Sequence, residues 1–148
     1  MNALLLPLLA FAGGLAIAMQ AGINAGLARH LGGSLPAAAV SFAVGTAALA
    51  GVCVVYRGGW PALAQWQAAP WHAWLGGLLG AAYVTLAVLL APRLGAATLI
   101  AWVVAGQLRA SLVLDHYGWL GFAVRPVNWQ RLVGAALLLG GAVLLVRH

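Results

Sequence analysis

Residues 4–28 read LLLPLLAFAGGLAIAMQAGINAGLA, a continuous stretch without a charged side chain. A helix needs roughly 20 mainly apolar residues to cross the hydrocarbon core of a bilayer, and this stretch exceeds that length. It is also too long for the apolar core of a cleavable signal peptide, which spans about 7–15 residues, and no basic residue precedes it. We therefore expect residues 4–28 to form a retained first membrane helix.

The composition of the whole chain extends this prediction. Of its 148 residues, 65% are hydrophobic and 5% are charged, whereas a soluble domain has about 45–50% apolar and about 25% charged residues. The apolar excess also excludes intrinsic disorder, because disordered chains have low hydrophobicity. We predict an all-α integral membrane protein with a single transmembrane domain over residues 1–148.

Arginines, glycines and prolines divide the chain into five expected spans. Ser34 is expected to be the N-cap of the second span, with Pro36 in its first turn, and Pro92 is expected to stop the third. The last span is short, and it crosses a bilayer only if the flanking Arg131 and Arg147 extend outward to the water. A four-helix alternative removes this last span. The expected spans lie at about residues 4–28, 36–56, 74–91, 95–115 and 132–146.

The segments between the spans carry their own signals. Residues 60–72 hold three tryptophans and two prolines, and tryptophan favours the headgroup level, so we expect a short interfacial segment. Residues 116–130 are expected to form a loop or re-entrant turn at the membrane surface. Inside the spans, Gly22-x-x-x-Gly26 and Gly76-x-x-x-Gly80 are small-xxx-small patterns, which favour a tightly packed bundle because they let helices approach closely in lipid.

All seven basic residues are arginines, and the chain has one acidic residue, which gives a net charge of +6. They form no run, so a nucleic-acid-binding patch is not expected. Basic residues favour the cytoplasmic side of a membrane protein. With five spans, three arginines fall on each side: Arg29, Arg93 and Arg147 on one, and Arg57, Arg125 and Arg131 on the other.

This balance has a consequence for assembly. Without a bias, the chain is predicted to insert in both orientations and to pair with its own inverted copy, as the two halves of an inverted-repeat transporter do within one chain. The resulting dimer would contain ten helices, five from each of two antiparallel copies. The alternative is that loop folding or a partner, such as an oppositely oriented homologue, fixes one orientation.

Polar side chains inside the expected spans are the candidate functional residues, because polar groups in hydrocarbon tend to face a bundle interior or a cavity. Gln20 and Asn24 are four residues apart and share one face of the first span. Gln107, Ser111 and Asp115 follow the same spacing on the fourth span. The opposite face of that span carries Thr98, Trp102 and Arg109. A helix that is polar on both sides belongs at the centre of an assembly.

Each of these residues has two interpretations. Gln20, Asn24 and Gln107 either contact a substrate or join helices through hydrogen bonds worth about 0.6–2 kcal/mol each. Asp115, next to His116, either ends its helix at the water boundary, which we favour, or is a protonatable coupling group. Arg109 either extends its side chain to the water, which we favour, or binds an anionic substrate.

The sequence offers no enzyme constellation. It has no Cys/His cluster for a metal and no Gly-x-x-x-x-Gly-Lys phosphate loop. One carboxylate cannot form an acid/base pair. We expect no catalysis, no cofactor and no ATP hydrolysis by this chain.

A set of short motifs runs through nearly the whole chain. They are Gln20 with Asn24, Val40-Ser41-Phe42 with Gly45-Thr46, Gly76-Gly77-x-x-Gly80 with Tyr83, Pro92-Arg93-Leu94-Gly95, Gly106-Gln107-Leu108, Ala110-Ser111-Leu112, Asp115-His116-Tyr117-Gly118 and Arg125-Pro126. Together they resemble the YdcZ-type branch of the drug/metabolite transporter superfamily.

The resemblance implies short five-helix proteins of the bacterial inner membrane that form dual-topology homodimers or oppositely oriented pairs. Arg109 departs from the pattern, which has an apolar residue there, so no family role is carried to that position.

The leading hypothesis is a small-solute secondary transporter that works by alternating access as an antiparallel dimer in the lipid bilayer. Its midplane site would be lined by Gln20, Asn24, Trp102, Gln107 and Ser111, with Asp115 as the one acid available for proton coupling. A small dual-topology anion channel is the second hypothesis, in keeping with the arginine excess. The third is a non-transporting partner of an oppositely inserted homologue.

Overall fold

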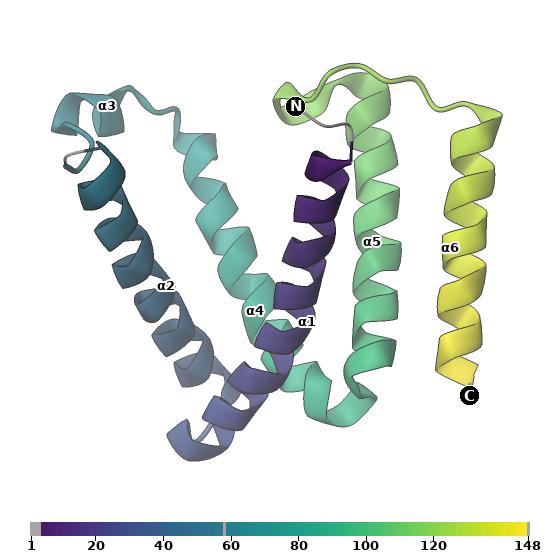
Figure 1. The fold of residues 1–148 in the computed structure, drawn as a ribbon, viewed down its shortest axis with the longest axis horizontal. Helices are drawn as coiled ribbons and strands as arrows, with labels where there is room; N and C mark the ends of the chain where they lie inside the picture. The colour runs from purple at the N-terminus through teal and green to yellow at the C-terminus, as the bar shows by residue number, and fades with distance from the viewer. Residues whose placement is uncertain (1–3, 58, 148) are drawn as a thin grey trace. The chain divides into compact units, whose positions relative to one another are not determined.

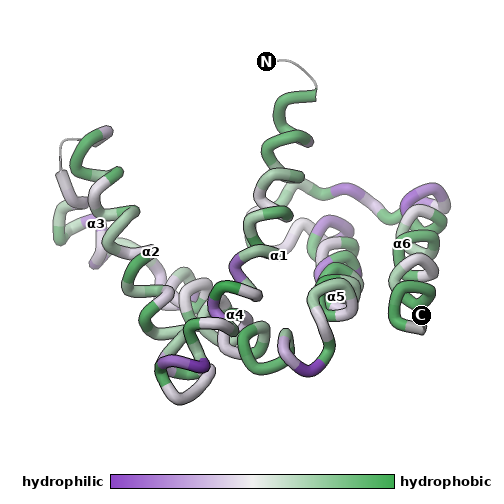
Figure 2. Tube along the Cα trace, turned by 60° about the horizontal axis from the view of Figure 1, so that its bottom comes forward, coloured by the Kyte–Doolittle hydropathy of each residue, from purple (hydrophilic) through white to green (hydrophobic). Residues whose placement is uncertain are grey.

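A computed structural model describes residues 4–57 and 59–147, and every regular element among them is helical (Figure 1). Five helices are long and apolar enough to cross a membrane, which confirms the five predicted spans, including the last one. Figure 2 shows that hydrophobic positions dominate along these helices. The elements are α1 (Leu5–Leu31), α2 (Ser34–Arg57), α3 (Leu63–Ala68), η1 (Trp71–Trp74), α4 (Leu75–Leu94), α5 (Ala96–Tyr117), η2 (Trp119–Gly121) and α6 (Trp129–Arg147).

The chain forms two compact units, Met1–Arg93 and Leu94–His148. In the first unit, α1 and α2 form an antiparallel hairpin. Gly32 adopts a left-handed conformation with φ +76°, which favours glycine, and this ends α1 three residues later than expected. The helix α2 begins at Ser34, so the expectation that Ser34 is an N-cap outside the helix was wrong. Instead, the carbonyl of Gly33 accepts the N–H of Ala37 (3.4 Å).

Small side chains make the core of the first unit. Ala37 and Ala38 of α2 are almost fully buried and pack against Val84 and Val88 of α4. An alanine at such a contact lets two helices come close without the lost rotamer freedom of a larger side chain. Of the four glycines in the two small-xxx-small patterns, Gly80 is the one that meets another helix, because a Cβ added there would lie 3.4 Å from the Phe42 ring.

The helix α4 continues past the expected stop. Pro92 lies in its last turn, where the missing N–H removes one hydrogen bond without ending the helix. The helix ends at Leu94, and Gly95 then turns the chain with φ +77°. The prediction that Pro92 stops the third span was therefore wrong.

The segment between α2 and α4 is short and aromatic. The ring centroids of Trp60 and Trp66 lie 6.0 Å apart, and those of Trp66 and Trp74 lie 5.4 Å apart, in a stacked row. The indole N–H of Trp66 donates to the carbonyl of Pro61 (3.2 Å). This row packs the apolar faces of the indoles against one another in the segment that we expect at the membrane interface.

In the second unit, α5 and α6 lie side by side (Figure 1). Leu99, Ala101 and Ala105 are buried on α5, and Ala135 is buried on α6. The helix α6 begins three residues earlier than expected because the Asn128 side chain accepts the N–H of Arg131 (2.9 Å) and caps the helix. The expectation of a short last span was therefore wrong. The side chains of Arg57 and Arg147 and residue Gly58 lie outside the described part of the chain.

Replacing Gly118 by alanine is expected to destabilise the second unit. Gly118 has φ +66°, and an added Cβ would lie 2.6 Å from Val124 Cγ2 and 3.3 Å from the Phe122 carbonyl oxygen. Gly32→Ala is the matched control, since Gly32 has φ +76° and open space around it. We expect Gly32→Ala to cost about 1–2 kcal/mol from left-handed strain alone, and Gly118→Ala to cost about 1 kcal/mol more. Thermal unfolding in detergent measures both, and equal midpoints would contradict the account of the Gly118 contact.

Candidate functional site

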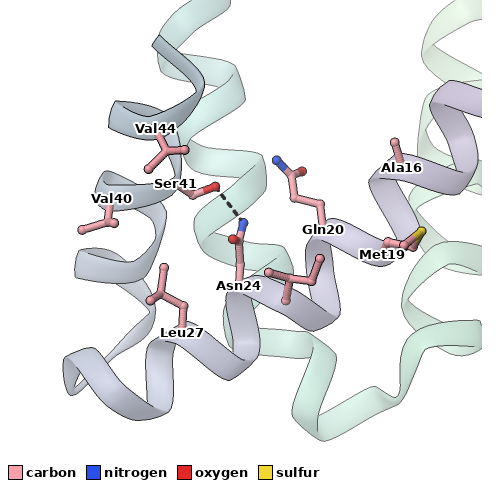
Figure 3. Close-up of a pocket in the computed structure, with 9 residues that line it drawn as sticks. Ala16, Met19, Gln20, Asn24, Leu27, Val40, Ser41 and Val44 are labelled. Atoms are coloured by element: carbon pink, nitrogen blue, oxygen red, sulfur yellow. Dashed lines mark hydrogen bonds between the residues drawn. The ribbon is translucent and has the colours of Figure 1, made fainter. Parts of the chain in front are cut away.

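A polar pair joins the two helices of the first hairpin. Asn24 of α1 is 5% exposed, and its Nδ2 donates a hydrogen bond to Oγ of Ser41 on α2 (3.1 Å; Figure 3). Asn24 lies seven residues before the end of α1, and Ser41 lies seven residues after the start of α2. Because antiparallel helices joined by a tight turn run level with one another, this equal spacing brings the two side chains to the same depth.

The pair lies on the wall of a cleft of about 490 Å³ between α1 and α2. Gln20 lies one turn before Asn24 on the same face of α1 and also lines the cleft (Figure 3). Gln20 is eleven residues from the end of α1, or about 16 Å at the helical rise, which is close to the middle of a hydrocarbon core about 30 Å thick. The other lining residues are apolar: Ala16, Met19, Ile23, Leu27, Val40 and Val44.

Close packing below the cleft fixes its shape. Leu27 and Ala28 of α1 pack against the buried cluster of Ala37, Ala38, Val84 and Val88, so α1 is held to the other helices of the first unit at that end. The cleft opens further along the hairpin, where Gln20 is exposed. The result is a mainly apolar cavity of ligand size with a few neutral polar groups on one wall, which is the usual form of a small-molecule site.

A second polar cluster joins the ends of α5 and α6. Nη2 of Arg131 donates to Oδ2 of Asp115 in an ion pair, with the two side chains 30% and 23% exposed. Nη1 of Arg131 donates to the carbonyl of Arg125 (2.7 Å), and the N–H of Arg125 donates to the carbonyl of Asp115 (2.7 Å). The N–H of Val127 donates to Nδ1 of His116 (3.1 Å).

These contacts fold the α5–α6 connection back onto the end of α5. The charge-assisted bonds of Arg131 are the strong ones in the set, because hydrogen bonds to charged groups contribute about 1.5–3 kcal/mol each. The carboxylate of Asp115 is thus engaged in holding two spans together. This geometry supports the interpretation of Asp115 as a structural group at the helix end.

The remaining predicted site residues lie on α5. Gln107, Arg109 and Ser111 are exposed, and Trp102 lines a small cavity of about 30 Å³ with apolar residues of α6. A groove of about 570 Å³ also lies between α5 and α6, and all of its lining residues are apolar. That groove offers no side-chain group to orient a solute. The structure brings Gln20 and Asn24 together in the first unit, while Trp102, Gln107 and Ser111 belong to the second.

Two contributors were missing from the residues selected by sequence. Ser41 is a lone hydroxyl in an apolar stretch, and its equal distance from the Gly32–Gly33 turn was the signal that pairs it with Asn24. Arg131 was expected to reach the water, but it pairs with Asp115. Among the residues that the structure describes, no group of three or more His, Cys, Asp or Glu residues could hold a metal ion.

Comparison with known protein families matches this chain to a family model. The family model described as "Putative inner membrane exporter, YdcZ" matches residues 5–144. Neither a curated protein nor a solved structure matches the chain. The family match and the five spans together identify an inner-membrane, multi-pass protein.

Proposed function

The chain belongs to the YdcZ inner membrane exporter family, and from that membership we propose that it exports small solutes as a secondary transporter. The proposed unit is an antiparallel dimer of two copies that works by alternating access. The observation that carries this proposal is the cleft between α1 and α2, which is lined by Gln20 and Asn24 of one helix long enough to span a membrane and by Ser41 of the other.

The position of these side chains supports a transport role. A polar group within the hydrocarbon is costly unless it has a partner or faces a cavity, and Asn24 has Ser41 as its partner. Gln20 faces the cleft at a depth near the middle of the bilayer, where transporters hold their substrates. In the dimer, we propose that Trp102, Gln107 and Ser111 of α5 complete the site.

The charges support the antiparallel arrangement. Alternation of the five spans puts three arginines at each membrane face, which provides no bias for one orientation. The ion pair with Arg131 favours a structural role for Asp115 over a role in proton coupling. Arg109 is exposed and lies eight residues before the end of α5, about 12 Å at the helical rise, and we propose that its side chain extends toward the water at that end.

A double variant tests whether the cleft binds the exported solute. Replacing Asn24 alone leaves the Ser41 hydroxyl without its partner, whereas replacing both by apolar residues of similar shape is nearly neutral for stability. We expect the double variant Asn24→Leu/Ser41→Ala to keep the wild-type unfolding midpoint and to lose about 90% of solute flux, which corresponds to about 1.4 kcal/mol. Flux is measured with purified protein in liposomes over a panel of solutes, with and without a pH gradient.

Matched controls make this test specific. Val54→Ile changes an exposed apolar residue of α2 outside the cleft and is expected to leave flux unchanged. Gln107→Ala is expected to lower flux, because we propose that α5 contributes to the site. Asp115→Asn is expected to leave the response of flux to a pH gradient unchanged, because we propose a structural role for Asp115. Normal flux from a folded Asn24→Leu/Ser41→Ala protein would mean that the pair only joins two helices.

A further inference from the structure

The polar groups of the α1–α2 cleft are all neutral. Its nine described lining residues include two carboxamides and one hydroxyl, and none of the nine is charged. Asn24 and Gln20 each offer both a donor and an acceptor, and the Ser41 hydroxyl that accepts from Asn24 still carries a proton to donate. Asn24 is buried and bonded to Ser41, so a solute in the cleft meets a mainly apolar surface with the exposed carboxamide of Gln20 and no counter-charge.

The chain has no free carboxylate to serve as a counter-charge for a cation. Its only acidic side chain is Asp115, which lies at the end of α5 and is bound by Arg131. The same holds for every copy of the chain in a dimer. Moving an organic cation or anion out of water without a partner is strongly unfavourable in a medium of low polarity, so the cleft discriminates by charge.

The rest of the lining defines the other part of the ligand. Met19, Ile23, Leu27 and Val44 provide apolar surface beside the polar wall, and the flexible thioether of methionine adapts to differently shaped hydrocarbon groups. A volume of about 490 Å³ suits a small organic molecule.

We propose that the cleft binds uncharged amphipathic solutes that carry an amide, carbonyl or hydroxyl group beside an apolar body, and that it rejects organic cations of the same shape. This proposal rests on the proposed export function for its biological meaning, because it names the class of solute that the same cleft accepts. The amide or hydroxyl group of the solute bonds with the exposed carboxamide of Gln20, and its hydrocarbon part contacts Met19 and the branched aliphatic residues.

The test compares two probes of one skeleton. N-tert-butylbenzamide is neutral, and N-benzyl-tert-butylammonium places a positive charge on the same framework. Binding of the tritiated probes is measured by equilibrium dialysis against the intact protein in lipid nanodiscs, with empty nanodiscs as the lipid background. We expect the wild-type protein to bind the amide at least about tenfold more tightly than the ammonium, or about 1.4 kcal/mol.

The substitution Gln20→Glu places a carboxylate in the cleft without touching the Asn24–Ser41 bond. It is expected to strengthen ammonium binding by about tenfold and to weaken amide binding, because the new charge supplies the missing counter-ion. Gln67→Glu, the same change at an exposed residue of α3, is expected to leave both affinities unchanged.

The possible outcomes distinguish a failure of the predicted charge preference of the cleft from a failure of the proposed export function. Equal or tighter binding of the ammonium by the wild-type protein, no binding of either probe, or an unchanged preference in Gln20→Glu would each overturn the inference. A protein that binds the amide with this preference but moves no solute across a liposome membrane would keep the inference about the cleft and refute export.

Discussion

Two variants with opposite orientation bias are expected to be inactive alone and active together. Gln67→Arg with His72→Arg adds two cations to the second connection, and His30→Arg with Ala96→Arg adds two on the other face. Each pair changes the three-against-three balance of arginines to five against three. Since basic residues stay on the cytoplasmic side, each variant is expected to insert in one orientation only.

A dimer that needs both orientations cannot form from either variant. We expect each alone to show about a tenth or less of the wild-type solute flux, and the two produced together to regain most of it, because only the mixture contains inverted pairs. Tags at both termini, probed for access from each side of the membrane, report the orientations. Full flux from a variant with a single orientation would show that the inverted pair is not required.

Reversing one charge of the Asp115–Arg131 pair is expected to destabilise the protein strongly. Breaking a fully buried ion pair costs about 3–5 kcal/mol, and an exposed one contributes less than about 1 kcal/mol. The two side chains are 23% and 30% exposed, so we expect Asp115→Arg to cost about 2–3 kcal/mol. That is a large share of a total stability of about 5–15 kcal/mol.

The exchanged pair Asp115→Arg/Arg131→Asp tests the cause. It restores opposite charges but not the bond from Arg131 to the Arg125 carbonyl, so we expect it to regain about half of the lost stability, with a matching gain in flux. Unfolding midpoints in detergent give the values. If Asp115 instead carries a coupled proton, the exchanged pair stays folded but its flux no longer responds to a pH gradient.

The spans were predictable because their cause is local. An apolar stretch of sufficient length must be a helix in lipid, since every backbone group needs an internal partner there. The helix ends were less predictable because single residues set them. Gly95 ends α4 beyond Pro92, and the Asn128 side chain starts α6 early. Such caps depend on the conformation of a few residues rather than on the apolar pattern.

The candidate site was predictable in part. The spacing of Gln20 and Asn24 fixed their common face, because residues four apart lie above one another on a helix. The partner of Asn24 depends on which face of α2 meets α1, and the buried Ala37 and Ala38 decide that through packing. The link between Asp115 and Arg131 spans sixteen positions and depends on the path of the loop between them, which the backbone turn at Gly118 sets.

Counterflow in liposomes that contain only this chain tests whether the protein moves solutes by alternating access. The vesicles are loaded in turn with each unlabelled solute of the panel, and a trace of the same solute in labelled form is added outside. Alternating access predicts that the label accumulates transiently above equilibrium, because outward solute drives inward exchange, and that Asn24→Leu/Ser41→Ala lacks this peak. Label that only equilibrates, with measurable electrical current, would indicate a channel, and no uptake at all would indicate a subunit that needs a partner; either result would contradict the account.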